Sequence, residues 1–432
     1  MNKKNNLESK IESLLQIAVK KHNNGQLEAA IEYYQQILKL KPDYAQVYSN
    51  LGVLLKQQGD LPAAINSFHQ AVKIKPDLVE AYCNLGTTLK KQGNLSAAID
   101  AFQQAVKIKP DLVEAHCSLG VALKEQGNLS DAIKSFQQAL KIQPDLDIAK
   151  FYICINQLPI IYKNVREIEL RRNNYQNQLQ ELAKYYKQAN LEQLKKAADT
   201  VGVSKPFYLA YQCLNNHDLQ KIYGEMLVQI MSNRYPQWSQ EIIQPHLQPN
   251  EKIRIGFISG CFHRHSVWKI PMKGWVENLD RSQFELFAYH TNTTLKHDSE
   301  TAVAGKAFDK FIKGPLEIEK WAEIIQKDRL HAIIFPEFGM DPIALKLGCL
   351  KLAPIQMTSW GHPDTSGLPT IDYYLSSELM EPENAQENYT EKLVKLPNLS
   401  IYYQSQAITP LKVTKKDIGI SDDAVMFWCC QS

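Results

Sequence analysis

The sequence contains no long hydrophobic run and no dense stripe of basic residues. None of its 432 residues fall in an apolar stretch of the roughly eighteen residues that a membrane span needs, and the first residues lack the apolar core of a secretory signal. It has 49 basic and 46 acidic residues, a formal net charge of only +3, which gives nucleic-acid binding little electrostatic support. We therefore expect a soluble cytoplasmic protein that binds neither membranes nor nucleic acid.

The sequence also lacks a cysteine framework. Its eight cysteines are scattered through helix-like and strand-like segments, and Cys83 and Cys117 occupy positions where a small buried residue fits. Disulfides are therefore not expected. A composition of 44% hydrophobic and 22% charged residues is typical of globular proteins, and the length suffices for two or three domains.

The first third of the chain is built from an internal repeat. The repeat is marked by a proline at a constant interval of 34 residues: Pro42, Pro76, Pro110 and Pro144. A glycine, an alanine and an aromatic residue recur at the same interval, as tetratricopeptide repeats require. A small residue lets two paired helices approach, the aromatic ring fills the gap between them, and the proline ends the second helix. The pattern predicts a superhelix whose inner groove binds an extended polypeptide.

Two asparagines are candidates for binding that polypeptide. Asn50 and Asn84 precede the Leu-Gly pair of two central repeats. A row of side-chain amides along one groove could hold a peptide backbone without demanding a particular sequence. The alternative is that both are simply solvated helix residues.

The repeat register is lost after residue 148, and an alternation of strands and helices begins after residue 250. Strands are predicted at 253–259, 284–289, 331–335 and 355–359, and helices near 267–279, 316–326 and 343–350. Such alternation predicts a parallel sheet with helices on both faces. Ligands bind such sheets beyond the carboxyl ends of the strands, so the segments after the first, third and fourth strands are candidate site loops.

The loop after the first strand carries Cys261, His263 and His265. An imidazole with a pKa near 6.5 is suited to accept or orient a proton at neutral pH. The three side chains alternate and could together bind zinc or copper, but no fourth ligand is evident nearby, so no metal site is predicted.

The apolar run at 424–430 has the character of a buried strand and is interpreted as the opening of a second α/β domain, within which the sequence stops. The expected divisions are a domain of four repeats (1–147), a helical connecting region (148–250), a first α/β domain (251–423) and the first strand of another (424–432).

In this order, the repeats and two loop motifs resemble the protein O-GlcNAc transferases, in particular their SPINDLY-like branch. The motifs are Gly-Phe-Ile-Ser-Gly-Cys-Phe-His-Arg-His at 256–265 and Ala-Pro-Ile-Gln-Met-Thr-Ser-Trp-Gly-His-Pro-Asp-Thr-Ser-Gly at 353–367. The resemblance implies a GT-B glycosyltransferase of two Rossmann-like halves, of which this sequence matches the first. It implies inverting transfer of GlcNAc or a related sugar from a UDP-sugar to Ser or Thr hydroxyls of proteins, without a cofactor.

Carried over residue by residue, the resemblance places the active-site histidine on His265. It also implies substrate-binding residues in two further loops: Trp360, Gly361, His362, Pro363, Thr365 and Met340. Two departures stand out. Cys261 replaces an acidic residue of the family, and the segment 205–212, which loosely matches one carrying a further family histidine, has none.

The sequence leaves two functions open. The first is a protein glycosyltransferase, in which a second half that holds most of the donor nucleotide follows in the gene or is supplied in trans. The second is a non-catalytic tetratricopeptide module that keeps the peptide groove after truncation of such an enzyme. The sequence does not distinguish GlcNAc from fucose.

Overall fold

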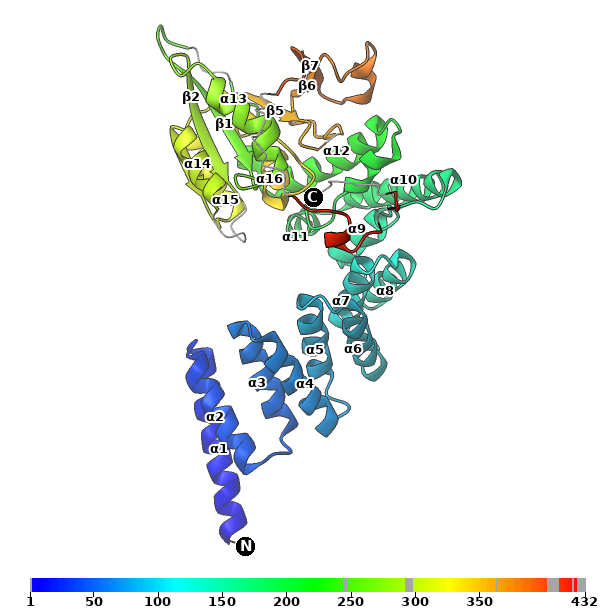
Figure 1. The fold of residues 1–432 in the computed structure, drawn as a ribbon, viewed down its shortest axis with the longest axis vertical. Helices are drawn as coiled ribbons and strands as arrows, with labels where there is room; N and C mark the ends of the chain where they lie inside the picture. The colour runs from blue at the N-terminus through cyan, green and yellow to red at the C-terminus, as the bar shows by residue number, and fades with distance from the viewer. Residues whose placement is uncertain are drawn as a thin grey trace.

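The computed structural model describes residues 2–243, 247–291, 298–362, 364–401, 412–421 and 423–425. Figure 1 shows a curved array of helices at the N-terminal end that leads into a domain built on a parallel sheet. No helix in these ranges is long and apolar enough to cross a lipid bilayer.

The array consists of antiparallel helix pairs that stack on one another. Its helices are α1 (Asn2–Asn23), α2 (Leu27–Leu40), α3 (Ala45–Gln58), α4 (Leu61–Ile74), α5 (Val79–Lys91), α6 (Leu95–Ile108), α7 (Val113–Glu125), α8 (Leu129–Ile142) and α9 (Asp147–Ile155). Each repeat proline follows the end of a second helix, as the sequence predicts. The predicted superhelix of tetratricopeptide repeats is confirmed.

The close approach within each pair has the predicted cause. A Cβ atom added at Gly52 of α3 would lie 2.7 Å from the ring of Phe68 on α4, and the same distance separates Gly86 from the Phe102 ring. Both rings are almost completely buried. The tight turn between paired helices also needs its glycine, because Gly59 has a φ of +89° that other residues rarely adopt.

Helix α9 belongs to two hydrophobic cores at once. Its Tyr152 stacks on Phe136 of α8 with ring centroids 4.7 Å apart, which continues the repeat stack by one helix. On its other face, Phe151 packs 5.8 Å from Tyr186 of the connecting region. The same second core contains Ile155. The helix therefore joins the array directly to the connecting region, without a linker.

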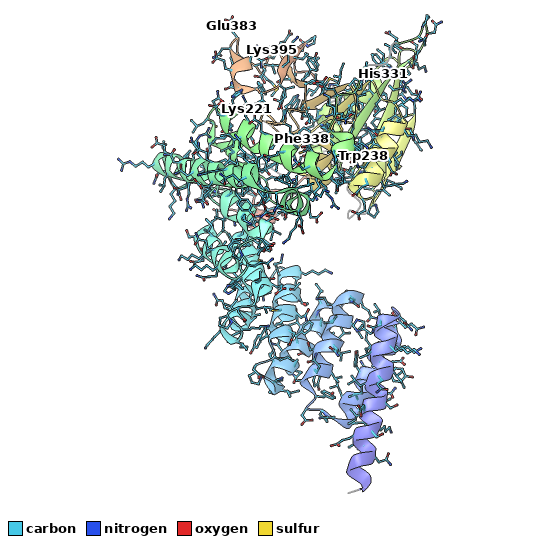
Figure 2. All side chains as sticks on the ribbon, turned by 180° about the vertical axis from the view of Figure 1, so that it is seen from behind. Lys221, Trp238, His331, Phe338, Glu383 and Lys395 are labelled. Atoms are coloured by element: carbon cyan, nitrogen blue, oxygen red, sulfur yellow. The ribbon has the colours of Figure 1, made fainter. Side chains whose placement is uncertain are left out.

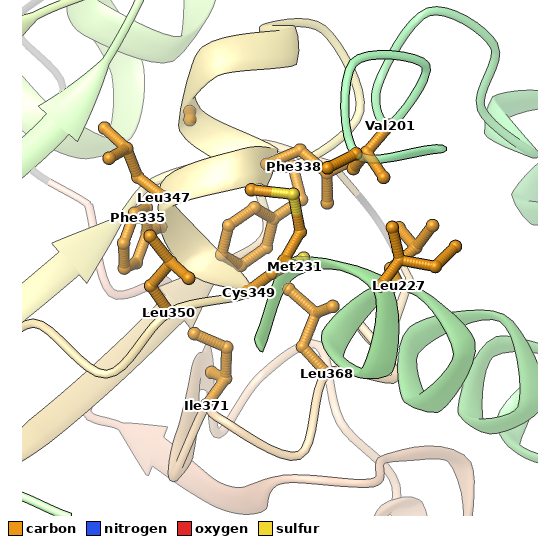
Figure 3. Close-up of a cluster of buried hydrophobic side chains, with 14 of the residues drawn as sticks. Val201, Leu227, Met231, Phe335, Phe338, Leu347, Cys349, Leu350, Leu368 and Ile371 are labelled. Carbon is orange, nitrogen blue, oxygen red and sulfur yellow. The ribbon is translucent and has the colours of Figure 1, made fainter. Parts of the chain in front are cut away.

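The connecting region shares a hydrophobic core with the α/β domain. It contains α10 (Val165–Gln188), α11 (Leu191–Ala197), η1 (Phe207–Gln212), α12 (His217–Arg234) and η2 (Pro236–Trp238). Figure 3 shows Met231 of α12 beside Phe338 and Cys349 of the α/β domain. In Figure 2, Phe338 lies between the sheet and the connecting helices, and Trp238 lies beside the domain, where its indole nitrogen donates to Gln326 over 3.0 Å.

Within the described ranges, the sheet has seven parallel strands in the order β3-β2-β1-β4-β5-β6-β7. The strands are β1 (Ile253–Ser259), β2 (Phe284–His290), β3 (Lys310–Lys313), β4 (Ala332–Phe335), β5 (Ile355–Ser359), β6 (Tyr373–Ser377) and β7 (Lys392–Leu396). The four predicted strands are present with nearly the predicted bounds. Sequence reasoning missed β3, β6 and β7, which lie toward the two edges of the sheet, and β3 and β7 contain no buried residue.

Helices cover both faces of the sheet, as predicted. They are η3 (Trp268–Met272), α13 (Lys273–Asn278) and α14 (Ser299–Ala307) on one face, and α15 (Ile318–Lys327) and α16 (Pro342–Gly348) on the other. Of the predicted strand at 424–430, residues 424 and 425 form no regular element and the remainder lies outside the described residues.

Candidate functional site

Three loops lie side by side at the carboxyl end of the sheet, because the seven described strands are parallel and their carboxyl ends face the same way. β1 pairs with β4, and β4 pairs with β5. The loops after these strands, 260–266, 336–341 and 360–368, are therefore neighbours at the position where open α/β sheets bind ligands.

His265 is half-buried in the first loop, and its orientation is fixed. Its Nδ1 atom accepts a hydrogen bond of 3.2 Å from the backbone N–H of Val267. This bond uses the Nδ1 lone pair, so the neutral ring carries its proton on Nε2. Burial and the nearby ring of His263, whose centroid is 5.4 Å away, lower the pKa of His265 below its usual 6.5. At neutral pH the side chain therefore offers a hydrogen-bond donor.

Cys261 lies in the same loop but is only 5% exposed. Burial, reinforced by the nearby Glu337, raises the pKa of its thiol far above the ordinary value, so it stays protonated. Within the described ranges, no three His, Cys, Asp or Glu side chains are grouped so that they could hold a metal ion.

The second loop is organised by two buried carboxyl groups. Glu337 is fully buried, and its Oε2 atom accepts a 2.7 Å hydrogen bond from the backbone of Met340. Its Oε1 atom has no partner among the described residues, and burial raises its pKa to about 7. Asp341 caps the start of α16 through the N–H of Ile343 and also accepts from the hydroxyl of Thr291. Met340 itself is 37% exposed.

The third loop runs directly against the second. Gly361 donates 3.1 Å to the carbonyl of Pro336, and a Cβ atom added at Gly361 would lie only 2.4 Å from that oxygen. The indole of Trp360 points away from this contact and donates 3.2 Å to the hydroxyl of Ser400. Only glycine at position 361 allows the backbones of the second and third loops to approach this closely.

His362 faces the connecting region. It is 8% exposed, its ring centroid lies 4.7 Å from that of Phe207, and its Nε2 atom is 3.4 Å from the Phe207 carbonyl. Burial lowers its pKa to about 4, so the ring is neutral at pH 7. Pro363, the next residue of the predicted site, lies outside the described residues.

Thr365 is 2% exposed, and its hydroxyl donates 2.6 Å to Glu391 while also contacting Thr390. The same carboxylate accepts from the backbone N–H of Ser366. Both hydroxyl-bearing residues therefore anchor the loop to the end of the sheet.

The rest of this loop docks on α12 through bare backbone. A Cβ atom added at Gly224 of α12 would lie 2.0 Å from the carbonyl oxygen of Gly367. Next to this contact, Asp364 accepts hydrogen bonds of 3.0 Å from Asn216 and Gln220, and burial raises its pKa to about 6. Sequence reasoning missed this docking, because its partners are more than a hundred residues apart.

The structure brings some predicted site residues together and not others. His362 and Thr365 line one small cavity of about 40 Å³. Met340 lines a different cavity. No hydrogen bond or ring contact in the described part of the chain joins His265 to Trp360 or His362.

Asn50 and Asn84 lie half-buried on α3 and α5, first helices of their repeats. The Oδ1 atom of Asn50 accepts 3.3 Å from Gln46, and that of Asn84 accepts 3.1 Å from Lys56 of the preceding repeat. The second bond crosses between repeats, which orients the Asn84 amide.

A cavity of about 740 Å³ lies where the array meets the α/β domain. It is lined by residues of the last repeat such as Leu129, by the segment after α9, by Lys205 and Phe207, and by Met340. Lys205 also lines the smaller cavity. Sequence reasoning did not single out Lys205 or Glu337, although Glu337 is a charged residue at a strand end, which is a signal that could have found it.

Both the sheet domain and the array match known protein families. Residues 226–419 match the model of glycosyl transferase family 41, and residues 21–127 and 113–146 match tetratricopeptide repeat models. The chain is 28% identical over 165 residues to a protein of Solanum lycopersicum described as a probable UDP-N-acetylglucosamine–peptide N-acetylglucosaminyltransferase SPINDLY. It is 25% identical over 186 residues to the SEC protein of Arabidopsis thaliana, which has a corresponding description.

These matches cover 36% and 41% of this chain but only 17% and 19% of the two relatives, so the chain matches less than a fifth of their length. Among solved structures, the O-GlcNAc transferase of Thermobaculum terrenum superposes with a TM-score of 0.52 at 20% identity, over 83% of this chain and 58% of that one. This likeness supports the fold. Together, the repeats, the family 41 match and the two relatives show that this chain is similar to the O-GlcNAc transferases and to the SPINDLY proteins.

Proposed function

We propose that the protein transfers GlcNAc or a related sugar from a UDP-sugar to Ser or Thr hydroxyls of a polypeptide that the repeat array holds. The main support is the 740 Å³ cavity, because its wall combines the last repeat with the loop that follows β4. A polypeptide that leaves the array groove enters this cavity at the carboxyl end of the sheet, where the site loops lie. The relatives' descriptions as peptide N-acetylglucosaminyltransferases agree with this reaction.

In this proposal His265 positions the acceptor. Its Nε2–H donates to the acceptor hydroxyl and orients the hydroxyl oxygen toward the anomeric carbon. A bond forms between these two atoms as the bond to UDP breaks with inversion, and the hydroxyl proton passes to the departing UDP phosphate or to water. A role as general base would require the bond between Nδ1 and Val267 to break first. Most donor contacts come from a second Rossmann-like half, on the same polypeptide or supplied in trans, and the reaction needs no resident cofactor. The proposal places the protein in the cytoplasm, which cell fractionation would test.

The test compares His265→Ala with His265→Gln in the longest form of the protein that its gene encodes. Removal of the side chain is expected to lower transfer to a serine peptide by about a hundredfold or more, with little change in peptide binding. Glutamine keeps an N–H donor and is expected to restore part of the rate, which it would not do for a lost base. His263→Ala serves as the control and should retain most activity.

Unchanged transfer after His265→Ala would contradict the proposed role. Peptide binding without UDP binding or transfer in any form would instead favour the non-catalytic binding module. In that case the double change Asn50→Ala and Asn84→Ala should weaken peptide binding, because it removes two amides from the groove.

A further inference from the structure

The repeat array carries a row of lysines that is not visible as a basic run in the sequence. Lys56, Lys90 and Lys124 are 34 residues apart, and they lie in the last turns of α3, α5 and α7, the first helices of three successive pairs. The rest of each repeat separates them along the chain. Stacking of the repeats places them at equivalent positions on neighbouring helices, so the folded array has a basic row along one side.

Two lysines of this row are held in place without a carboxylate. The ammonium of Lys56 donates over 3.1 Å to Oδ1 of Asn84 in the next repeat. The ammonium of Lys124 lies 5.1 Å from the centroid of the Tyr152 ring on α9. Both lysines are half-buried, and burial lowers the pKa of each. Among the described residues, neither has a carboxylate oxygen within 4 Å. Each is therefore a positioned, partly desolvated cation to which an anion can bind.

The acidic groups of the same helices lie at the opposite end. Lys90 is 2.9 Å from Glu125 of the next repeat, and Lys91 adds a second cation in the same turn. Glu80 and Glu114 lie in the first turns of α5 and α7, ten residues before the lysines, which corresponds to about 15 Å along the helix axis. Physiological salt screens most of the attraction over that distance. The first helices thus present a basic edge and a separate acidic edge.

A polypeptide with spaced carboxylates fits the basic edge better than a nucleic acid does. A nucleic acid carries a phosphate at every nucleotide and needs a dense basic surface, whereas the row offers one lysine per repeat on a chain with a net charge of only +3. The Asn84 amide beside the row suits a peptide backbone. Lys124, the last lysine of the row, also lines the 740 Å³ cavity. A polypeptide that follows the row therefore reaches the cavity beside the strand-end loops.

We propose that the lysine row binds an acidic segment of the acceptor polypeptide, at a distance from the hydroxyl that is modified. Carboxylates of this segment pair with Lys56 and Lys124, and they compete with Glu125 for Lys90. This inference rests on the proposed function, in which the array holds the acceptor. It names the substrate class as proteins that carry an acidic stretch to one side of the modified serine or threonine.

The test measures binding of two fluorescein-labelled peptides to the full chain by anisotropy. Both peptides have a central serine, and one carries several glutamates on each side of it where the other carries glutamines. At about 50 mM salt the natural protein is expected to bind the glutamate peptide about tenfold more tightly, because several exposed ion pairs act together. At about 0.5 M salt this preference should largely disappear, because the added ions screen the pairs.

Two triple variants locate the preference on the array. The first removes the row through Lys56→Met, Lys90→Met and Lys124→Met, and it should bind the two peptides equally. Methionine keeps the aliphatic stem of lysine, so the repeats should fold, which circular dichroism verifies. The control removes the same charge at the same interval from exposed positions in the last turns of the second helices α4, α6 and α8, through Lys73→Met, Lys107→Met and Lys141→Met. The control should keep the preference.

Three results would overturn the inference. They are equal affinity of the natural protein for the two peptides at low salt, a preference that survives removal of the row, and an equal loss of preference in the control variant. Binding of a labelled thymidine oligonucleotide as tight as that of the glutamate peptide would also overturn it, because the row would then select negative charge and not a polypeptide. Binding is measured without transfer, so a chain that prefers the glutamate peptide but never glycosylates it would refute only the proposed function.

Discussion

The repeat array and the strand-end loops are stabilised in different ways. In the array, each contact joins neighbours along the sequence, such as Gly52 with Phe68, and the same contact recurs in the next repeat. In the loops, each contact is unique and joins distant segments, such as Gly224 with Gly367 or Thr365 with Glu391. The stability of the array is therefore distributed over repeated copies of one contact, whereas the arrangement of the candidate site depends on contacts that occur once.

The largest expected effect comes from the array. Phe102→Ala should lower the free energy of unfolding of the repeats by about 3–5 kcal/mol, because it leaves a cavity in a fully packed site. Amide hydrogen exchange should show the loss in α5 and α6 and not in the central strands, since repeats interact only with their neighbours. The exposed Gln103→Ala is the control. Equal loss of amide protection in β1 and β4 would show that the array and the sheet unfold together, which contradicts the difference described above.

A pH-dependent effect should come from the loops. Burial raises the pKa of Glu337 to about 7 from 4.5, so the folded state holds its proton more tightly than the unfolded state. The contribution of this group to stability is complete below about pH 4.5 and is lost as pH rises through 7. Glu337→Gln should therefore be more stable than the natural protein at pH 8, by about 3 kcal/mol at most.

Thermal unfolding at pH 4 and pH 8 measures this effect. Equal stability of the two proteins at pH 8 would show that Glu337 is not held protonated. His362, whose pKa burial lowers to about 4, acts in the opposite direction, since its contribution is lost as pH falls below 6.5. His362 is present in both proteins, so only the difference between them reports on Glu337.

A smaller effect on stability is expected where the backbone of α12 contacts the backbone of the 360–368 loop. Gly224→Ala should destabilise the protein by about 1–3 kcal/mol, because the added methyl group meets a carbonyl that cannot move aside as a side chain would. Denaturant unfolding measures the change. Gly305→Ala is the control, since its nearest neighbour would be 4.0 Å away. A neutral Gly224→Ala would mean that loop 360–368 shifts easily on α12.

The smallest effect should come from an ion pair on the array surface. Lys90 lies 2.9 Å from Glu125 of the next repeat, with both side chains partly exposed. A double-mutant cycle with Lys90→Met and Glu125→Gln should give a coupling of less than about 1 kcal/mol, reduced further by salt. A larger coupling energy would show that this ion pair contributes to the packing of neighbouring repeats.

The sequence predicted the array almost completely, because the residues that pack its helices recur at one constant interval along the chain. It predicted the four central strands from their apolar residues, which are densest in β1 and β4. It did not predict β3 and β7, which contain no buried residue, or β6, which ends in two serines. The helix α9 lies beyond the last repeat proline, so its membership of two cores has no periodic signal.

The candidate site was predictable only in part. His265 and the β5 loop were found through their position after predicted strands and through motif resemblance. Their surroundings, however, depend on pairs such as His362 with Phe207 that are 155 residues apart. The side-chain nitrogens of Asn156 and Lys205 are buried and have no hydrogen-bond partner among the described residues. The sequence does not reveal this, because a polar residue at either position looks like any solvated one. The predicted roles of Trp360, Met340 and the other loop residues stay predictions.

The double membership of α9 has a mechanical consequence. A helix with one face in each core connects the last repeat to the connecting region by packing, which favours movement of the repeats and the sheet as one body. A polypeptide gripped in the array would then present its hydroxyls at a fixed contour length from the point of attachment. In the proposed function, the spacing between a segment held in the array and a serine would then decide whether that serine reaches the site.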